Sequence, residues 1–434
     1  MRTSRVKRAG ALLVGLTLVA AACGSDDDSS DEGAATTDAT ESTDGGEAAD
    51  GSCETDGVLN FGTILPVTGD LAQLGPAEIA GSNLAAADIN AAGGVLGADI
   101  VMNQGDSGDT TTDTANLEVD RLLAAGADAI VGAASSAVSK TVIDKITGSC
   151  VIHFSPANTS PDFTTYDDNG LYFRTAPSDL LTGRVLANLV LDEGNETASV
   201  IFRQESYGVG LSAAFQENYE AAGGVIDEFI PYAVDTESYD AEVDSLVEAG
   251  SDAIIVIGFA ESGNIVNTMH ERGIGPTSET NVYGTDGNLG DIGVQVGDPS
   301  IVVGFTGVQP SVDLATIPDF VERLDGEGDM GGIYVYGAET YDAVVITALA
   351  AAIAGTDDPS AIAAEINGVT KDGEKCISFE ECIALVDAGT DIDYDGIGGP
   401  YEFVDAGEPA AASYEIGRYE GGENFVPVEY VFAS

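Results

Sequence analysis

From Val58 onward, short apolar runs of strand length alternate with longer stretches in which apolar residues recur at helical spacing. A first set of strands is predicted at 59–65, 100–103, 129–131 and 151–154, with helices at 77–92, 114–125 and 137–147. A second set repeats this order, with strands at 199–202, 225–230, 253–257 and 281–283 and helices at 181–191, 209–221, 241–249 and 265–271. Such alternation indicates parallel sheets wrapped by helices.

Two short passages occur in both sets. The run G-A-D-A-I-V-G at 126–132 returns as G-S-D-A-I-I-V-I-G at 250–258, and N-A-A-G-G-V at 90–95 is echoed by Y-E-A-A-G-G-V at 219–225. Two related units of about 125 residues fit the usual domain size. Chance recurrence of a common helix-glycine-strand pattern is the alternative. A third portion from about 332 adds a long helix at 334–354, helices near Ala361 and Ile383, and closing strands at 401–404 and 413–419.

The first 22 residues predict export. Four basic residues within 2–8 precede an apolar run at 9–22, which is typical of a secretory signal peptide. The run ends V-A-A-A-C-G and resembles a bacterial lipobox, so Cys23 is expected to carry a diacylglycerol. Ala20 stands where Leu is usual, and cleavage after the A-x-A site is the alternative. No later stretch reaches about 18 consecutive apolar residues, so the lipid is the one membrane contact expected.

Residues 24–52 contain Ser, Thr, Asp, Glu, Gly and Ala but no aromatic residue, Val, Ile or Leu, and are predicted to form a disordered acidic tether from Cys23. Removal of 1–22 takes four of the 15 basic residues and none of the 74 acidic ones. Nucleic acid and anionic lipid surfaces are therefore disfavoured as partners. A surface this acidic suits a salty exterior, where screening shortens the repulsion.

Four cysteines remain beyond Cys23, an even number in an oxidising compartment, and they predict two disulfides. Cys376 and Cys382 are six residues apart and can join a loop to the first turn of a helix. Cys53 and Cys150 then pair by elimination. Zinc binding is the competing interpretation, but the spacing is wrong for it and both histidines lie in unrelated segments.

Candidate binding residues follow the predicted strands, because ligands of open parallel sheets bind beyond the carboxyl ends of the strands. Ser135 and Ser136 follow the strand at 129–131 and open a helix, where a hydroxyl and backbone N–H groups can meet a carboxylate, although an ordinary N-cap is the simpler interpretation. The loop 155–161, flanked by prolines, follows the next strand. From the second unit, Tyr207, Phe259 and Asp286 could place an aromatic wall and a carboxylate opposite.

At this point the sequence resembles the branched-chain amino-acid (Leu/Ile/Val) type of periplasmic binding protein. The resemblance extends from Gly57 over nearly all the remaining chain. It rests on the order and spacing of six passages: L-P-V-T-G at 65–69, A-D-I-N-A-A-G-G-V-L-G at 87–97, V-G-A-A-S-S at 131–136, F-S-P-A at 154–157, F-R-T-A-P-S at 173–178 and Y-G at 207–208.

The resemblance implies a site for an amino acid, without metal or cofactor. It assigns the carboxylate-binding serine to Ser136, the A-x-T loop to Ala157 and Thr159, the ammonium-binding acid, usually Glu, to Asp286, and the aromatic contacts to Tyr207 and Tyr334. Leu74 stands where an aromatic residue can occur, and Phe259 replaces a possible Tyr. A general amino-acid site is therefore expected, without one side-chain preference.

The implied fold is a type I periplasmic binding protein, α/β, with two doubly wound parallel-sheet lobes joined by a three-segment hinge. Lobe 1 is expected to comprise 57–178 with 309–395, and lobe 2 to comprise 179–308 with 396–434. The implied role is to deliver a small molecule to an ABC permease complex from the exterior or periplasm. There are two alternatives: a sensory module of the same fold, or an importer subunit for an amide, urea or aromatic acid.

Two other signals carry less weight. Residues 391–402 match the calcium loop D-x-D-x-D-G-x5-E, but Pro400 lies inside the pattern and the following residues resemble a strand. Enzyme motifs such as G-x-S-x-G, H-E-x-x-H or a P-loop do not occur. No metal site and no enzymatic activity are expected.

Overall fold

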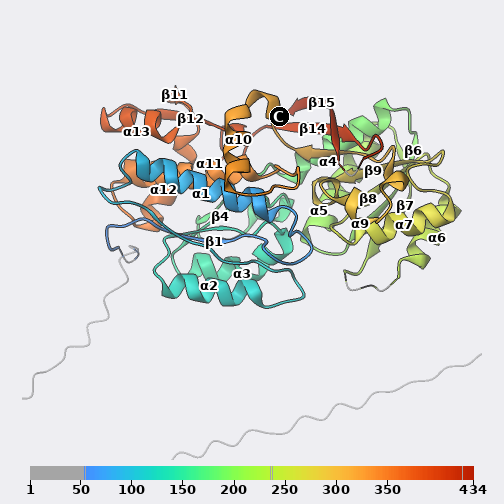
Figure 1. Ribbon diagram of the computed structural model, residues 1–434, viewed down its shortest axis with the longest axis horizontal. Coiled ribbons are helices and arrows are strands. Elements are labelled where there is room, and N and C mark those ends of the chain that lie inside the picture. Colours follow the sequence, from blue (N-terminus) through green and yellow to red (C-terminus); the bar gives the residue numbers. More distant parts are fainter. Residues whose placement is uncertain (1–52, 54, 235, 237, 423) are drawn as a thin grey trace, which may run out of the picture. The chain divides into compact units, whose positions relative to one another are not determined.

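Five parallel strands form the first sheet of the computed structural model, which describes residues 53, 55–234, 236, 238–422 and 424–434. The strands are β1 (Asn60–Ile64), β2 (Val101–Asn103), β3 (Ala129–Gly132), β4 (Ile152–Ser155) and β5 (Tyr172–Arg174), in the order β2-β1-β3-β4-β5 (Figure 1). The predicted signal peptide, Cys23 and the predicted tether lie outside the described residues.

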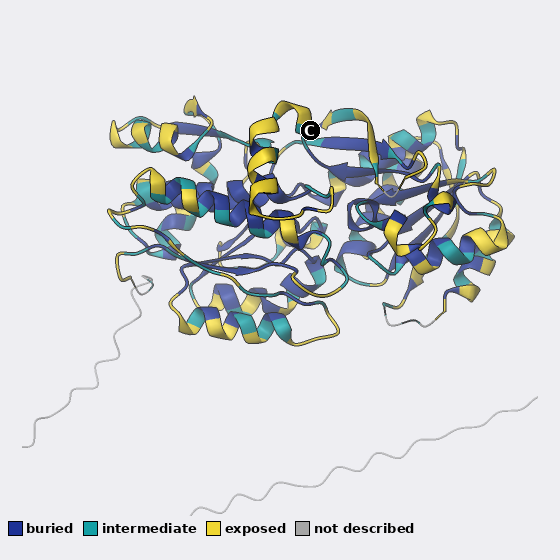
Figure 2. Cartoon of the chain, in the orientation of Figure 1, coloured by how far each residue is buried: buried dark blue, intermediate teal, exposed yellow. Residues whose placement is uncertain are grey.

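Helices cover both faces of this sheet because successive strand residues point to opposite sides. Ala129 and Val131 pack with α1 (Gly75–Ala91), α11 (Gly337–Ala354) and α12 (Pro359–Val369), whereas Ile130 packs with α2 (Thr114–Ala124) and α3 (Ser136–Gly148). Figure 2 shows the strands buried and the outer helix surfaces exposed.

The second sheet has seven strands in the order β15-β14-β10-β9-β8-β6-β7. Its members are β6 (Thr197–Arg203), β7 (Val225–Tyr232), β8 (Ala253–Ile257), β9 (Asn281–Thr285), β10 (Thr306–Pro310), β14 (Ala412–Arg418) and β15 (Val426–Ala433). Strands β6 to β10 are parallel to one another. Strand β14 pairs antiparallel with β10 and with β15. Its covering helices are α4 (Asp179–Asp192) and α5 (Ser206–Ala221) on one face, and α6 (Asp240–Ala249), α7 (Ser262–Arg272) and α9 (Ile292–Gln295) on the other.

The sequence repeat corresponds to equivalent positions in the two lobes. Asp128 accepts a hydrogen bond from the backbone N–H of Asn60 at the start of β1. Asp252 accepts one from the backbone N–H of Thr197 at the start of β6. Each acid therefore joins two neighbouring parallel strands at their amino ends. Together with the two parallel sheets, this repeat confirms the predicted two-lobed parallel architecture.

Three connections join the sheets, after β5, after β10 and before β14, and residues of all three line one cavity of about 120 Å³. The third connection lies later than the expected division at 395/396. Tyr401 and Phe403 pack into the core of the first sheet, and β13 (Gly399–Pro400) pairs with β12 (Ile392–Gly396). The expected boundary therefore falls inside the small sheet β11-β12-β13, whose first strand is β11 (Glu374–Cys376).

The remaining elements are short or lie at the edges of the lobes. They are α8 (Asp286–Leu289), α10 (Pro318–Glu327), α13 (Phe379–Asp387) and the 3-10 helices Pro161–Thr165, Pro299–Val302 and Leu314–Thr316.

Helix α11 is the one described helix long and apolar enough to cross a membrane, yet 83% of its 18-residue window is buried within the protein. It packs against α1, α12 and the first sheet. Its apolar character is that of a core helix.

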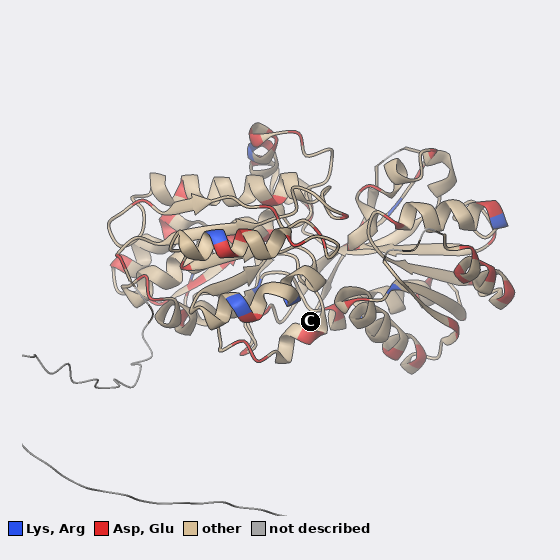
Figure 3. Cartoon of the chain, turned by 90° about the horizontal axis from the view of Figure 1, so that it is seen from below, with Lys and Arg blue, Asp and Glu red and all other residues tan. Residues whose placement is uncertain are grey.

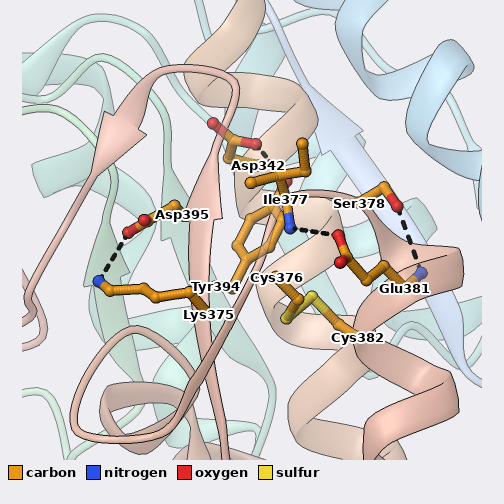
Figure 4. The surroundings of a disulfide bond; sticks show 9 residues. All are labelled: Asp342, Lys375, Cys376, Ile377, Ser378, Glu381, Cys382, Tyr394 and Asp395. Atoms are coloured by element: carbon orange, nitrogen blue, oxygen red, sulfur yellow. Dashed lines mark hydrogen bonds and ion pairs between the residues drawn. A yellow bond between two sulfur atoms is a disulfide. The ribbon is translucent and has the colours of Figure 1, made fainter.

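Both predicted disulfides are present. Cys53 bonds to Cys150, and Cys376 bonds to Cys382 between β11 and the first turn of α13 (Figure 4). The first closes a loop with a sequence separation of 97 and the second one of 6.

Because a disulfide restricts the unfolded chain more when its loop is longer, the two bridges differ in their expected effect. Replacing Cys53 and Cys150 by Ala is expected to lower the free energy of unfolding by about 4 to 5 kcal/mol, and replacing Cys376 and Cys382 by about 2 kcal/mol. Urea unfolding of the two double variants measures both. An equal or reversed order would contradict the loop-length argument.

Candidate ligand-binding cleft

Loops from the carboxyl ends of both sheets enclose one small polar cavity. Its lining comes from the first lobe, from the second lobe and from the segment before α11: Leu71, Leu74, Ala134, Ser136, Ala157, Tyr207, Phe259, Asp286, Gly287 and Tyr336. The space that admits the centre of a water molecule is about 10 Å³, enough for about one water. An amino acid therefore fits only if the lobes move apart and close again around it.

The second lobe supplies the negative pole of this cavity. Asp286 begins α8 and is 6% exposed. Its Oδ1 accepts a hydrogen bond of 2.8 Å from the Tyr207 hydroxyl, and its Oδ2 accepts one of 2.7 Å from Tyr336. Burial raises the pKa of Asp286, and the two tyrosine donors oppose that shift. The carboxyl is held in place by neutral donors, which leaves a charge that a cation could neutralise.

The first lobe supplies donors. Ser135 is the N-cap of α3, and its side chain accepts a hydrogen bond from the backbone N–H of Val138. Ser136, the first helical residue, lines the cavity and accepts a hydrogen bond from the N–H of Ser160 at 3.3 Å. A hydroxyl beside the N-terminus of a 13-residue helix favours a negatively charged group.

A buried arginine fixes the loop that bears Ala157 and Thr159. Arg174 Nη1 donates to the carbonyl oxygens of Asn158 and Ser160 at 3.0 and 2.8 Å, and its Nε donates to Glu408 at 2.9 Å. The Asn158 amide in turn donates to the carbonyls of Ala133 and Ala134. The two strand-end loops of the first lobe are thus held as one rigid unit.

Contacts between the lobes flank the cavity. Arg203, at the end of β6, is 1% exposed and pairs with Asp70 of the first lobe at 2.9 Å and with Glu261 of its own lobe at 2.9 Å. Its guanidinium lies 3.8 Å from the ring centre of Phe259, which lines the cavity. Ion pairing between the lobes and the position of an aromatic cavity wall are therefore coupled.

Two further hydrogen bonds join the lobes. The Ser206 hydroxyl donates to Ser160 Oγ at 2.9 Å. Gln73 Nε2 donates to the Gly287 carbonyl at 3.4 Å.

Five of the eight residues predicted to bind ligand line this cavity: Ser136, Ala157, Tyr207, Phe259 and Asp286. Ser135 lines a neighbouring cavity that also contains Asp70 and Arg203. The Thr159 hydroxyl is buried and donates to Asp179 Oδ2 at 2.9 Å.

Tyr334 requires a correction. It lies outside the cavity and its hydroxyl donates to Asp325, whereas Tyr336, two residues later, takes the expected place. Tyr336 has a left-handed backbone (φ 64°) that turns the chain into α11, and this turn determines which of the two tyrosines faces the cleft.

Sequence reasoning also did not find Leu71, Gly287 or Tyr336 as lining residues. Leu71 and Gly287 lie within a few residues of Leu74 and Asp286, which the resemblance placed near the ligand. Their closeness in the sequence to these two residues was the signal that could have found them. For Tyr336 the sequence Y-V-Y-G contains two candidates and no indication of which one turns inward.

Among the described residues no group of three His, Cys, Asp or Glu side chains is arranged to hold a metal ion. The acids of the calcium-like segment 391–402 surround an ammonium instead. Lys375 Nζ lies 2.8 Å from Asp393, 2.9 Å from Asp395 and 3.5 Å from Glu402. Hydrogen bonds to Asp393 and Asp395 raise the pKa of Lys375. Figure 4 shows the contact between Lys375 and Asp395. The segment forms β12 and β13 rather than a helix-flanked loop.

Two α/β lobes that enclose a polar cavity between their strand-end loops define a two-lobed solute-binding fold. The chain belongs to the periplasmic binding protein family, whose sequence profile matches residues 58–423. The resemblance to the Leu/Ile/Val type is thereby confirmed at the level of family and fold. A family of binding proteins also fits the expectation that the chain is not an enzyme.

Individual relatives are distant. The chain is 24% identical over 368 residues to the chemotactic signal transduction system substrate-binding protein BasB of Halobacterium salinarum, covering 81% of this chain and 84% of that protein. It is 26% identical over 320 residues to a leucine-, isoleucine-, valine-, threonine- and alanine-binding protein of Pseudomonas aeruginosa, covering 70% and 81%.

Solved structures show the same fold. The branched-chain amino acid transporter substrate-binding protein LivJ from Streptococcus pneumoniae, in complex with isoleucine, superposes with a TM-score of 0.71 at 21% identity. The match covers 86% of this chain and 99% of that one.

Because Arg174 neutralises Glu408 and donates to two carbonyls inside the protein, its loss leaves a buried carboxylate without its cation and both carbonyls without the arginine donor. Arg174→Met is expected to lower the free energy of unfolding by about 3 to 5 kcal/mol. Arg323→Met, which removes a partly exposed ion pair with Asp88, is the control and should cost about 1 kcal/mol or less. Urea unfolding measures both, and similar losses would show that Arg174 does not hold the loop.

Proposed function

We propose that this protein is an extracytoplasmic solute receptor that closes its two lobes around a free amino acid. The observation that supports the proposal most is the pairing of opposite poles in one cavity. Asp286, held by Tyr207 and Tyr336, faces the same cavity as Ser136 at the start of α3. A zwitterion needs an acceptor for its ammonium and donors for its carboxylate, and this arrangement provides both.

The side-chain end of the ligand is expected to meet an apolar wall. Leu71, Leu74 and Phe259 lie around the cavity, and Tyr207 and Phe259 stack with ring centres 5.3 Å apart. This lining supports an uncharged side chain. The amino-acid ligands named for the Pseudomonas aeruginosa and Streptococcus pneumoniae proteins agree with it.

Delivery of the ligand to an ABC permease is the first expected use of the closed form, because closure creates a surface that the loaded receptor alone presents. The similarity to BasB supports a second use, in chemotaxis. Deletion of the gene separates the two: loss of uptake supports the importer role, and loss of attraction with intact uptake supports the sensory role.

Titration calorimetry of the mature protein tests the ligand class with amino acids, amides, urea and aromatic acids such as benzoate. An α-amino acid is expected to bind, and the corresponding amide and deaminated acid to bind at least about tenfold more weakly, since each loses one charged pole. Tight binding of an aromatic acid or urea with no binding of any amino acid would contradict the proposal.

Two substitutions test the poles of the cavity. Ser136→Ala and Asp286→Asn are each expected to weaken amino-acid binding by about 1 to 3 kcal/mol, because each leaves a buried charged group of the ligand without its partner. Asp291→Asn, which changes an acid bonded to Gln295 outside the cavity, is the matched control. Unchanged affinity in both site variants would remove the zwitterion site.

We also propose that the mature protein is anchored by a lipid on Cys23, a position outside the described residues. The sequence V-A-A-A-C-G supports this proposal. The wild-type protein is expected in the membrane fraction and the Cys23→Ser variant in the soluble extracytoplasmic fraction. Equal partitioning of the two would indicate ordinary cleavage without acylation.

A further inference from the structure

One buried arginine connects the contact between the lobes to the aromatic residues of the cavity. Arg203, the last residue of β6, is 1% exposed. Three acids surround its guanidinium: Glu261 and Glu205 of its own lobe, at 2.9 and 3.4 Å, and Asp70 of the first lobe, at 2.9 Å. The same guanidinium lies 3.8 Å from the ring centre of Phe259. A cation buried to this degree holds its partners firmly, because a shift would leave a desolvated charge unpaired.

Glu261 extends this constraint to Phe259. Its Oε1 accepts hydrogen bonds from the backbone N–H of Phe259 at 3.1 Å and from the Tyr232 hydroxyl at 2.7 Å, in addition to the one from Arg203. Phe259 is therefore held twice, by its backbone through Glu261 and by its ring through the cation–π contact with Arg203. That ring lines the ligand cavity and is 4% exposed.

Glu205 extends the constraint to Tyr207. It is the N-cap of α5, and its side chain accepts hydrogen bonds from the backbone N–H groups of Tyr207 and Gly208, both at 3.0 Å. The ring of Tyr207 stacks on that of Phe259. Arg203 thus contacts the two acids that hold both members of this stacked pair, which we call the aromatic wall.

Asp70 connects the aromatic wall to the first lobe. Of the acids that pair with Arg203 in the described part of the chain, Asp70 alone belongs to that lobe, and its side chain is 18% exposed. When the lobes part, Asp70 regains water and Arg203 keeps Glu205 and Glu261. Opening therefore does not leave Arg203 as an unpaired buried charge. The ion pair between Arg203 and Asp70, which we call the latch, can stabilise the closed form and still break on each opening.

We propose that Arg203 is a positioning residue that determines both the side-chain preference of the site and the rate at which the ligand leaves. It holds the aromatic wall against the uncharged side chain of the ligand, and the latch keeps this wall joined to the first lobe in the closed form. Arg203 itself does not line the cavity. The inference rests on the proposed amino-acid function and adds the residue that selects among amino acids.

The two roles of Arg203 have different signatures. A displaced aromatic wall loses contact with a long side chain, whereas alanine, with a single methyl group, is affected little. A lost latch shortens the lifetime of every complex to a similar degree, because it acts on closure and not on the side chain. General destabilisation of the fold lowers the fraction of competent protein and leaves the affinity ratio of two amino acids unchanged.

Calorimetry of the mature protein measures the first signature, with the tightest amino acid of the titration panel and alanine as the two ligands. Arg203→Lys keeps the charge but loses the planar group that stacks on Phe259 and reaches three acids. It is expected to weaken binding of the tightest amino acid by about tenfold and binding of alanine by about twofold or less. Arg272→Lys is the matched control and should change neither affinity, because its partners Asp240 and Asp244 lie outside the cavity.

Stopped-flow dissociation measures the second signature. Asp70→Asn removes the charge of the latch and leaves the aromatic wall in place. It is expected to raise the dissociation rate of both ligands by a similar factor, about three- to tenfold, with their affinity ratio unchanged. Asp99→Asn, which alters an exposed acid of the same lobe, is the control and should leave the dissociation rates unchanged.

The outcomes separate this inference from the proposed function. If the wild type binds no amino acid, both fall. If it binds alanine most tightly, or if Arg203→Lys keeps the wild-type affinity ratio, the proposed function stands and the role of Arg203 in selection is wrong. Unchanged dissociation rates in Asp70→Asn would overturn the latch. A ratio that falls in Arg203→Lys alone, together with faster release in Asp70→Asn, supports the proposal.

Discussion

The arrangement of the cleft depends on the buried carboxyl of Asp286. Both of its oxygens accept hydrogen bonds from tyrosine hydroxyls, Tyr207 from the second lobe and Tyr336 from the segment before α11. Neutral donors hold the group in position without neutralising it, so the charge remains available to a ligand. A donor-rich helix start at Ser136 faces the same cavity from the first lobe. A zwitterion with an ammonium and a carboxylate group on one carbon would match both poles of this cavity.

Two of the few cations of this acidic protein hold groups around the cleft in place. Figure 3 shows Asp and Glu spread over the visible helices, with few Lys and Arg. Arg174 and Arg203 are nonetheless almost fully buried, one beneath the Asn158–Ser160 loop and the other between Asp70 and Glu261. Salt screens the outer charges but reaches these buried pairs much less. A salty medium therefore relieves repulsion at the surface without loosening the cleft.

The sequence predicted the elements whose signal is local. Apolar runs and helical spacing located β1 to β4, β6 to β9 and their helices, and the repeated G-x-D-A-I passages marked β3 and β8. Ser136 and Asp286 could be selected because parallel strands end at one edge. Tyr336 could not be distinguished from Tyr334, since a left-handed residue at the start of α11 decides between them. The third connection was placed too early because the strand pairing of Gly399 and the packing of Phe403 are tertiary properties.

A crystal structure of the mature protein with its tightest amino-acid ligand tests the central claim most directly. The account predicts the ligand between the lobes, with its ammonium within hydrogen-bond distance of Asp286 and its carboxylate at Ser136 and the first turn of α3. A ligand bound in the reverse orientation, or outside the space between Ala157 and Phe259, would contradict it.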